Sequence, residues 1–339
     1  MSSLINKFSW SSSRRSLLRE CARKYYYHTY LKWGGWDRSA PERSRKAYFL
    51  SKMTQGSFLV GTLVHSAIEA AFKDHVVLRK PLEGDCSKYI EEVLQEWDKI
   101  IEFNSTASKE ALKNTWSKDS IILREYYYDH PEKPGARERD KIQRILKRFF
   151  SSEYWLNLVS GPQLDVLVLD SESDRFKTVP IEGVDCYVLP DVVYRDSEGK
   201  VYVIDWKTGS QKPEDVDQAT FYALAVSKLY DIPVENISIN LVYLGNTSSR
   251  QYPEVSTILL DSKIVEHCKK SLLESAQLML SYVEDREQNK PKDEKHFSTT
   301  ESIEYCETCN FYEICEDSPL KQTKLELEIP TEKDPFFEL

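Results

Sequence analysis

The stretch Pro190-Asp-Val-Val-Tyr-Arg-Asp-Ser-Glu-Gly-Lys-Val-Tyr-Val-Ile-Asp-Trp-Lys207 decides the fold, because it holds a whole β-hairpin with an acid near each end. Residues 192–195 and 201–204 are rich in Val, Ile and Tyr, and Ser-Glu-Gly interrupts them, which predicts two antiparallel strands and a turn. A turn centred on Glu198 places Asp191 opposite Asp205, with Cβ atoms about 4.5–5.5 Å apart. Lys207 shares the face of Asp205, because side chains alternate along a strand.

Two carboxylates held this close need a proton or a cation between them. The hairpin therefore predicts a metal site formed by Asp191 and Asp205, with an ammonium group beside it. Two other acids, Glu182 and Asp185, lie on the preceding strand-like segment and compete for this role. Asp185 is out of register with the mirrored hairpin position, so we rank it below Asp191.

The composition is that of a globular protein that does not span a membrane. The 339 residues are 40% hydrophobic and 12% aromatic, and no run of 18 uncharged apolar residues occurs. The first ten residues lack the apolar core of a signal peptide, so we expect a cytoplasmic protein. A net charge of −9 disfavours non-specific nucleic-acid binding. Basic residues gather at 14–24 and 137–148, where they either bind phosphates or form solvated helix faces.

The order of periodic segments predicts an α/β fold with a mixed sheet flanked by helices. We expect helices at 11–31, 58–74, 89–103, 109–127, 137–150, 213–229 and 262–287. Strands are expected at 164–169, 184–189, 237–244 and 255–260, in addition to the hairpin.

Three motifs resemble the PD-(D/E)XK, or restriction-endonuclease-like, nucleases, and in particular their RecB-type branch. They are Pro190-Asp191 with Asp205-Trp206-Lys207, then Gly61-Thr-Leu-Val-His65, then Gln218-Ala-Thr-Phe-Tyr222. AddB and the Cas-type exonucleases of CRISPR adaptation belong to this branch. The resemblance implies one nuclease domain over residues 1–320, with a helical insertion at 75–155 and a cysteine region at 303–316. Residues 321–339 form an acidic tail that we expect to be flexible.

The resemblance also implies a chemistry that suits these residue types. Phosphodiester hydrolysis needs an activated water and charge neutralisation at the phosphate, which Mg²⁺ or Mn²⁺ supplies. Asp191, Asp205 and the backbone carbonyl of Trp206 would hold the metal, because Mg²⁺ prefers oxygen ligands. Lys207 would position the attacking water and offset developing negative charge. The Trp206 side chain points to the opposite face and should pack under a helix.

Three further residues have two interpretations each. A lone His on an apolar helix face is commonly a partly buried structural residue, whereas the resemblance implies that His65 is a metal ligand. Gln218 and Tyr222 lie one helical turn apart and face the same way. They are either ordinary amphipathic packing or, as the resemblance implies, part of the catalytic site at its rim, in contact with the DNA strand.

Seven cysteines in a cytoplasmic chain should be free thiols or metal ligands. Three of the cysteines form a C-x2-C-x5-C cluster, a spacing that is unlikely by chance: Cys306-Glu-Thr-Cys309-Asn-Phe-Tyr-Glu-Ile-Cys315. Together with Cys21 on an early helix, these cysteines resemble the RecB-type iron–sulfur nucleases, which implies a 4Fe–4S cluster joining the N- and C-terminal parts. Zn²⁺ is the alternative, although zinc sites usually come as two Cys-x2-Cys pairs. The remaining cysteines read as small buried hydrophobes. They are Cys86, Cys186 and Cys268.

The resemblance implies a metal-dependent deoxyribonuclease, an exonuclease on single-stranded or end-bearing DNA. Its setting would be DNA repair, recombination, or CRISPR- or phage-related processing, with a helicase or a CRISPR adaptation protein as partner. The alternative is a non-catalytic DNA-binding or scaffold subunit of a helicase–nuclease complex. The complete acid–acid–lysine set favours the enzyme, because a decayed site should have lost at least one of the three.

Overall fold

A computed structural model describes residues 6–82, 84, 86–114, 120–169 and 178–322. The chain forms two compact units. One contains residues 9–11 and 54–276, and it holds the main sheet. The other combines residues 12–53 with the segment from residue 277 onward, so both ends of the chain contribute to it.

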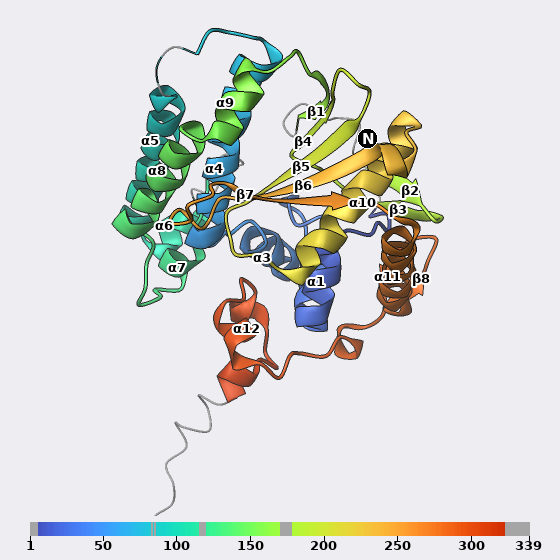
Figure 1. Cartoon of the computed structure of the whole chain (residues 1–339). Helices are drawn as coiled ribbons and strands as arrows, with labels where there is room; N and C mark the ends of the chain where they lie inside the picture. The colour runs from blue at the N-terminus through green and yellow to red at the C-terminus, as the bar shows by residue number, and fades with distance from the viewer. Residues whose placement is uncertain (1–5, 83, 85, 115–119, 170–177, 323–339) are drawn as a thin grey trace, which may run out of the picture. The chain divides into compact units, whose positions relative to one another are not determined.

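The main sheet has five strands in the order β1-β4-β5-β6-β7 (Figure 1). Their bounds are Asp165–Leu169, Val192–Arg195, Val201–Lys207, Ile237–Tyr243 and Glu254–Leu259. Strands β5 and β6 are parallel and the other neighbours are antiparallel, so the predicted mixed sheet is confirmed. A parallel pair needs a crossover connection, which helix α10 (Pro213–Tyr230) provides.

The hairpin has the register that the sequence predicts. Val192 pairs with Ile204 and Arg195 with Val201, which centres the turn on residue 198. Asp196 stabilises this turn, because its Oδ1 accepts the backbone N–H groups of Glu198 and Lys200, both at 2.9 Å.

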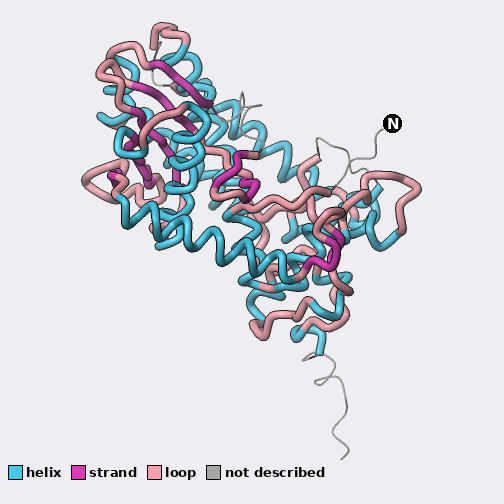
Figure 2. Tube along the Cα trace, turned by 90° about the vertical axis from the view of Figure 1, so that its right-hand side faces the viewer, coloured by secondary structure: helices cyan, strands magenta, loops and turns pink. Residues whose placement is uncertain are grey.

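Helices pack together on one side of the sheet and bury its apolar residues (Figures 1 and 2). The ring of Trp206 lies 5.5 Å from that of Phe149 and 6.2 Å from that of Tyr154, so its predicted packing under helices is confirmed. Most of residues 75–155 are helical, as expected. The helices of this group are α4 (Gly56–Phe72), η2 (Lys73–Val77), α5 (Ser87–Thr106), α6 (Lys109–Asn114), α7 (Arg124–Tyr127), α8 (Ala136–Phe150) and α9 (Glu153–Ser160).

Helix α10 packs on strands β5 and β6. Trp10, fully buried, anchors this region, because its ring lies 4.3 Å from Phe221 of α10 and its Nε1 donates to Ser275 Oγ at 2.8 Å. The remaining elements of this unit are β2 (Val179–Ile181) and β3 (Val184–Cys186), which form a separate two-stranded sheet, η5 (Val234–Asn236), and most of α11 (Ser262–Ser281).

In the other unit, ion pairs join the N- and C-terminal segments. Arg23 lies 3.2 Å from Glu294 and 3.0 Å from Asp317, and Arg43 lies 2.6 Å from Glu294. The N-terminal elements are α1 (Ser12–Glu20), α2 (Ala22–Tyr26), the π-helix η1 (Tyr27–Leu31) and α3 (Glu42–Leu50). The C-terminal ones are β8 (Val283–Asp285), β9 (Lys290–Pro291), η6 (Glu294–His296), α12 (Ile303–Glu307) and η7 (Tyr312–Ile314).

Several expected elements differ from the structure. The helix predicted over 11–31 breaks at Cys21, whose extended backbone and sulfur cap α2. The helix predicted to residue 287 ends at Ser281, because 283–285 pair as a strand. The strand predicted over 184–189 ends at Cys186, and the helix predicted over 109–127 is interrupted. The acidic tail lies outside the described residues, apart from its first two.

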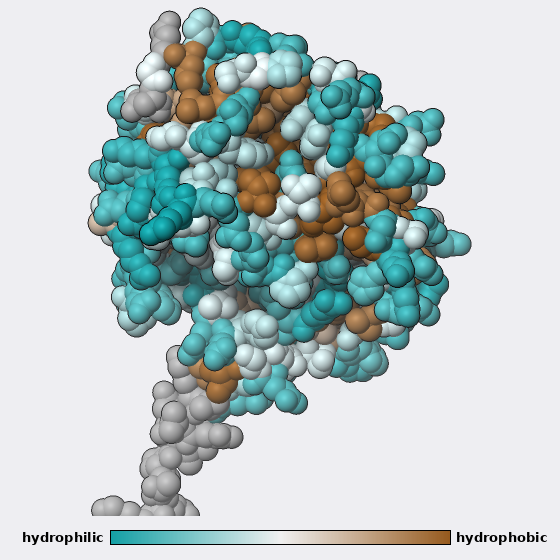
Figure 3. All heavy atoms as spheres, viewed as in Figure 1, coloured by the Kyte–Doolittle hydropathy of each residue, from teal (hydrophilic) through white to brown (hydrophobic). Residues whose placement is uncertain are grey.

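Polar side chains cover most of the visible face, with smaller apolar areas between them (Figure 3). Among the described residues, no helix combines the length and the apolar character that a membrane crossing requires.

Candidate active site and cysteine pocket

Asp191 and Asp205 face each other across the β4–β5 hairpin. Asp191 directly precedes β4, and Asp205 directly follows Ile204, the partner of Val192, so the two acids lie one residue beyond the last pair of the hairpin. Asp205 is buried, with 5% of its surface exposed. Burial, and then the charge of Asp191, raise the pKa of Asp205 to about 7. A carboxyl in this environment binds a proton or a cation far more readily than one in water.

Nitrogen atoms of the protein lie close to three of the four carboxylate oxygens of Asp191 and Asp205. Asp191 Oδ2 accepts the backbone N–H of Trp206 at 2.7 Å, and Asp191 Oδ1 lies 3.3 Å from His65 Nδ1. The ammonium of Lys207 lies 2.6 Å from Asp205 Oδ2. Even so, that buried oxygen accepts no hydrogen bond of good geometry from the described residues. The ion pair with Lys207 therefore leaves this oxygen open to another cation, since a short N–O distance with poor direction is a weak hydrogen bond.

His65 reaches the site from α4, as expected from its place in the Gly-x-x-x-His motif. Burial lowers the pKa of its imidazole, but the hydrogen bond and the charge of Asp191 outweigh burial and raise the pKa overall. Beside Asp191, the ring is positioned either to ligate a metal through a nitrogen or to orient the carboxylate.

Lys207, Gln218 and Tyr222 form a hydrogen-bonded chain. Lys207 Nζ donates to Gln218 Oε1 at 2.8 Å, and Gln218 Nε2 donates to Tyr222 Oη at 2.7 Å. The helical spacing that placed the last two on one face is confirmed, and that face meets the end of β5. Their side chains thus fix the position of the ammonium group.

Two residues of this site, Asp215 and Tyr243, were not predicted from the sequence. Asp215 is buried, and its Oδ1 lies 3.7 Å from Lys207 Nζ. Asp215 Oδ2 accepts the backbone N–H of Lys212 at 2.9 Å and the hydroxyl of Tyr243 at 3.1 Å. The acid three residues after Lys212, at the start of a helix, is a capping signal that would have indicated Asp215.

The competing acids lie elsewhere. Glu182 makes an ion pair of 2.6 Å with Lys269. Asp185 is exposed on β3, which belongs to a different sheet from the hairpin.

The donor set suits a hard divalent cation, since it offers carboxylate oxygens, one of them without a good hydrogen bond, and an imidazole. In the described residues no three His, Cys, Asp or Glu side chains converge closely enough to form a finished metal site. The roles of His65 and of the Trp206 carbonyl as ligands remain predictions.

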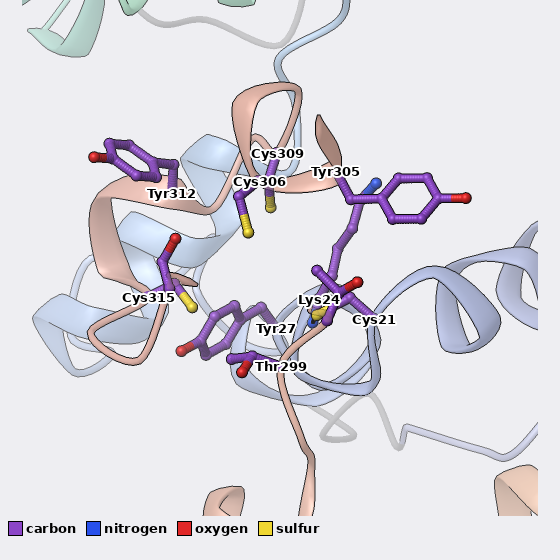
Figure 4. Close-up of a pocket in the computed structure, with 11 residues that line it drawn as sticks. Cys21, Lys24, Tyr27, Thr299, Tyr305, Cys306, Cys309, Tyr312 and Cys315 are labelled. Carbon is purple, nitrogen blue, oxygen red and sulfur yellow. Dashed lines mark hydrogen bonds between the residues drawn. The ribbon is translucent and has the colours of Figure 1, made fainter. Parts of the chain in front are cut away.

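The four expected cluster cysteines line one pocket. Cys21 caps α2, Cys306 lies on α12, and Cys309 and Cys315 flank η7. Figure 4 shows the sulfurs of Cys306, Cys309 and Cys315 turned towards the interior, with Cys21 across the pocket beside Lys24. Residues that are 285 or more positions apart in the chain therefore share one lining.

The pocket holds its thiols in an environment where a bare thiolate is costly. Burial raises the pKa of Cys309 to about 12 and that of Cys315 to about 11, and neighbouring cysteines add to both shifts. Metal binding removes this cost, because the metal charge compensates the thiolates. Among the described residues, the thiols do not converge into a metal-ligand set. Cys86, Cys186 and Cys268 are buried, as predicted.

Comparisons with known proteins agree with the motifs. A family model described as the PD-(D/E)XK nuclease superfamily matches residues 9–316. No curated protein matches the chain. Among solved structures, the chain is similar to one described as the crystal structure of SSO0001, with 12% sequence identity and a TM-score of 0.25. That match covers 86% of this chain and 95% of the other. A likeness at this level says nothing further about function.

Proposed function

The chain belongs to the PD-(D/E)XK nuclease superfamily, and from that premise we propose that it is a Mg²⁺- or Mn²⁺-dependent deoxyribonuclease. The observation that carries the proposal is the meeting of Asp191, Asp205 and Lys207 at one end of the hairpin. Its substrate would be single-stranded or end-bearing DNA, from which it would remove nucleotides at a free end, as an exonuclease. A metal there would supply Lewis-acid stabilisation of the phosphate and an activated water.

The residues around the metal have distinct proposed roles. Asp191 and Asp205 hold the cation, with the Trp206 carbonyl and His65 completing its protein ligands. Lys207 orients the water and stabilises negative charge on the phosphate, and the bond from Lys207 to Gln218 keeps the ammonium in place. Tyr222 holds Gln218 in turn.

Cleavage of end-labelled DNA tests this proposal. Single-stranded, duplex, flapped and circular substrates are incubated with Mg²⁺ or Mn²⁺, using the wild type, Asp205→Ala and Lys207→Ala. We expect cleavage of substrates with free ends by the wild type, and its loss in both variants. Asp185→Ala is the matched control, because this exposed acid lies on another sheet and should leave cleavage intact. Equal cleavage by all four proteins would refute the assigned site.

For the cysteine pocket we propose a 4Fe–4S cluster held by the four lining cysteines, with Zn²⁺ as the alternative occupant. The support is their common pocket and the cost of burying thiolates without a metal. The cluster would be structural, tying two chain segments that are far apart in the sequence.

Metal analysis of anaerobically purified protein tests this part. We expect iron, sulfide and visible charge-transfer absorption, which Cys309→Ser and Cys315→Ser should abolish. Cys268→Ala is the control, since this buried thiol lies on α11 outside the pocket. Zinc in place of iron would decide for the alternative, and protein without either metal would refute the proposal.

A further inference from the structure

A surface of exposed aromatic side chains lies in the unit formed by both chain ends. Trp33 and Trp36 keep 39% and 43% of their surface exposed, which is unusual for so large an apolar residue. Their rings meet edge to face at 5.1 Å, and the ring of Trp36 lies 5.8 Å from that of Tyr48. We call these three residues the tryptophan surface.

The backbone holds this surface in a fixed geometry. In the turn between η1 and α3, the N–H of Trp33 donates to Tyr30 and that of Gly35 donates to Lys32, both at 3.0 Å. Gly34 has a φ of +77°, which other residues rarely adopt. A Cβ on Gly35 would overlap the carbonyl oxygen of Ser44, so the turn lies tightly against α3. Both indoles are therefore pre-positioned for a flat partner.

Positive charge gathers at the same surface. Lys52 Nζ lies 5.1 Å from the centre of the Tyr48 ring, and Lys32 directly precedes Trp33. Lys32 Nζ lies 3.3 Å from His28 Nε2. Burial, followed by the charges of Lys52 and Arg14, lowers the pKa of Lys32 to about 8. The cations thus lie close enough to repel one another, and an anionic partner would relieve that repulsion.

The acid in this turn, Asp37, keeps its negative charge. Asp37 Oδ1 accepts the N–H and the hydroxyl of Ser39, at 2.8 Å and 2.7 Å. Residues 32–52 nevertheless carry six Lys or Arg residues against two acids, so aromatic faces and edges lie in a segment with a surplus of cations. An acidic peptide would match the cations but offers flat rings only where it carries aromatic residues, whereas a polyanion with a flat apolar group in every unit matches both features.

We propose that the tryptophan surface, with Lys32 and Lys52, binds single-stranded DNA by stacking unpaired bases on Trp33 and Trp36. The lysines then lie beside the backbone phosphates. Aromatic side chains next to cations form the sequence-tolerant platforms on which single strands stack. The choice of DNA rests on the proposed function, while the need for unpaired bases comes from the surface itself. Duplex DNA hides its base faces and would not stack here.

Fluorescence anisotropy with a labelled oligothymidylate tests the surface. Binding is measured in EDTA, so that no cleavage occurs, with the full-length wild type and with Trp33→Ala and Trp36→Ala. Each variant should bind about 5- to 150-fold more weakly, the range measured for the loss of one stacked base. Tyr187→Ala is the matched control, because Tyr187 is 48% exposed but lies in the sheet-containing unit. Its affinity should equal that of the wild type.

A conservative variant and a charge variant keep the test valid if an alanine variant of a tryptophan unfolds. A Trp33→Phe/Trp36→Phe double variant retains aromatic faces, so it should bind far better than either alanine variant. It should also lose the quenching of indole fluorescence that stacked bases cause in the wild type. Lys52→Ala should flatten the dependence of affinity on salt, because one phosphate contact is removed.

The outcomes separate this proposal from that of nuclease activity. Unchanged affinity in folded alanine variants, equal affinity for a duplex, or stronger binding of oligouridylate would overturn the DNA-binding surface, whether or not the wild type cleaves DNA. Weakened binding in those variants would support it even if the wild type showed no cleavage with Mg²⁺ or Mn²⁺.

Discussion

The chain of hydrogen bonds from Lys207 through Gln218 to Tyr222 predicts a graded loss of activity. Gln218→Ala removes the oxygen that holds the Lys207 ammonium at 2.8 Å. Only 17% of the Lys207 side chain is exposed, so water replaces that acceptor incompletely. A hydrogen bond to a charged group contributes about 1.5–3 kcal/mol. If the displaced ammonium no longer aligns the attacking water, kcat should fall by about 10- to 150-fold.

Tyr222→Phe removes only the far link of the chain. The bond from Gln218 Nε2 to the phenol is a neutral one, which contributes about 0.5–1.5 kcal/mol. The corresponding loss in kcat is about 2- to 12-fold. Gln218→Glu keeps an oxygen facing the ammonium and should retain more activity than Gln218→Ala. The expected order of loss is Lys207→Ala, then Gln218→Ala, then Tyr222→Phe.

Single-turnover cleavage of an end-labelled single strand at saturating Mn²⁺ measures this order without a contribution from product release. A separate Mn²⁺ titration provides the control, because the Gln218 and Tyr222 variants should bind the metal as the wild type does. Wild-type rates for Gln218→Ala, or a larger loss for Tyr222→Phe than for Gln218→Ala, would show that the chain does not position Lys207.

Three other predictions concern stability and metal binding. Asp205→Asn should raise the Tm of the metal-free protein, since it removes a buried charge beside Asp191, and should abolish Mn²⁺ binding in a titration. Burial alone would raise the pKa of Glu294. The hydrogen bond from Arg43 outweighs burial, so the pKa of Glu294 is lowered overall. The ionised Glu294 carboxylate therefore adds stability above pH 4.5, and this stability is lost as the pH falls through the lowered pKa of Glu294. Urea unfolding of Glu294→Gln should show a deficit of about 1–3 kcal/mol at pH 7 that shrinks below pH 4.5, and a constant deficit would contradict this. Gly35→Ala should lower the Tm by several degrees, because the added Cβ would overlap the carbonyl oxygen of Ser44. An unchanged Tm would mean that the turn shifts to admit the Cβ without loss of stability.

The sequence predicted the sheet well because its signals are local. A hairpin needs only two β-rich runs and a turn, and the pairing of Val192 with Ile204 follows from their distance to Glu198. The breaks in long helices were harder to predict. Cys21 ends α1 by capping α2 with its sulfur, which cysteine seldom does, and the switch to a strand after Ser281 depends on pairing with residues 290–291.

In the candidate site, too, the contacts that depend on local spacing were predicted, and those that depend on long-range pairing were not. The spacing along one strand placed Asp205 and Lys207 on a common face, and helical spacing aligned Gln218 with Tyr222. Tyr243 arrives through the parallel pairing of β6 with β5, in which it lies directly opposite Lys207. A crossover helix, α10, connects these two strands, and no local sequence pattern sets the register in which they pair. A long-range contact of this kind becomes visible only in the folded chain.

If the proposed function holds, the charge balance of the site predicts that the metal binds before the substrate. Three carboxyl groups, those of Asp191, Asp205 and Asp215, lie near a single ammonium, that of Lys207. A phosphodiester approaching this group of acids without a metal meets net negative charge, which repels it. A divalent cation on Asp191 and Asp205 reverses the local field and leaves Lys207 free to act on the water. DNA cleavage should therefore depend on the metal more steeply than DNA binding does, because binding to aromatic faces elsewhere needs no metal.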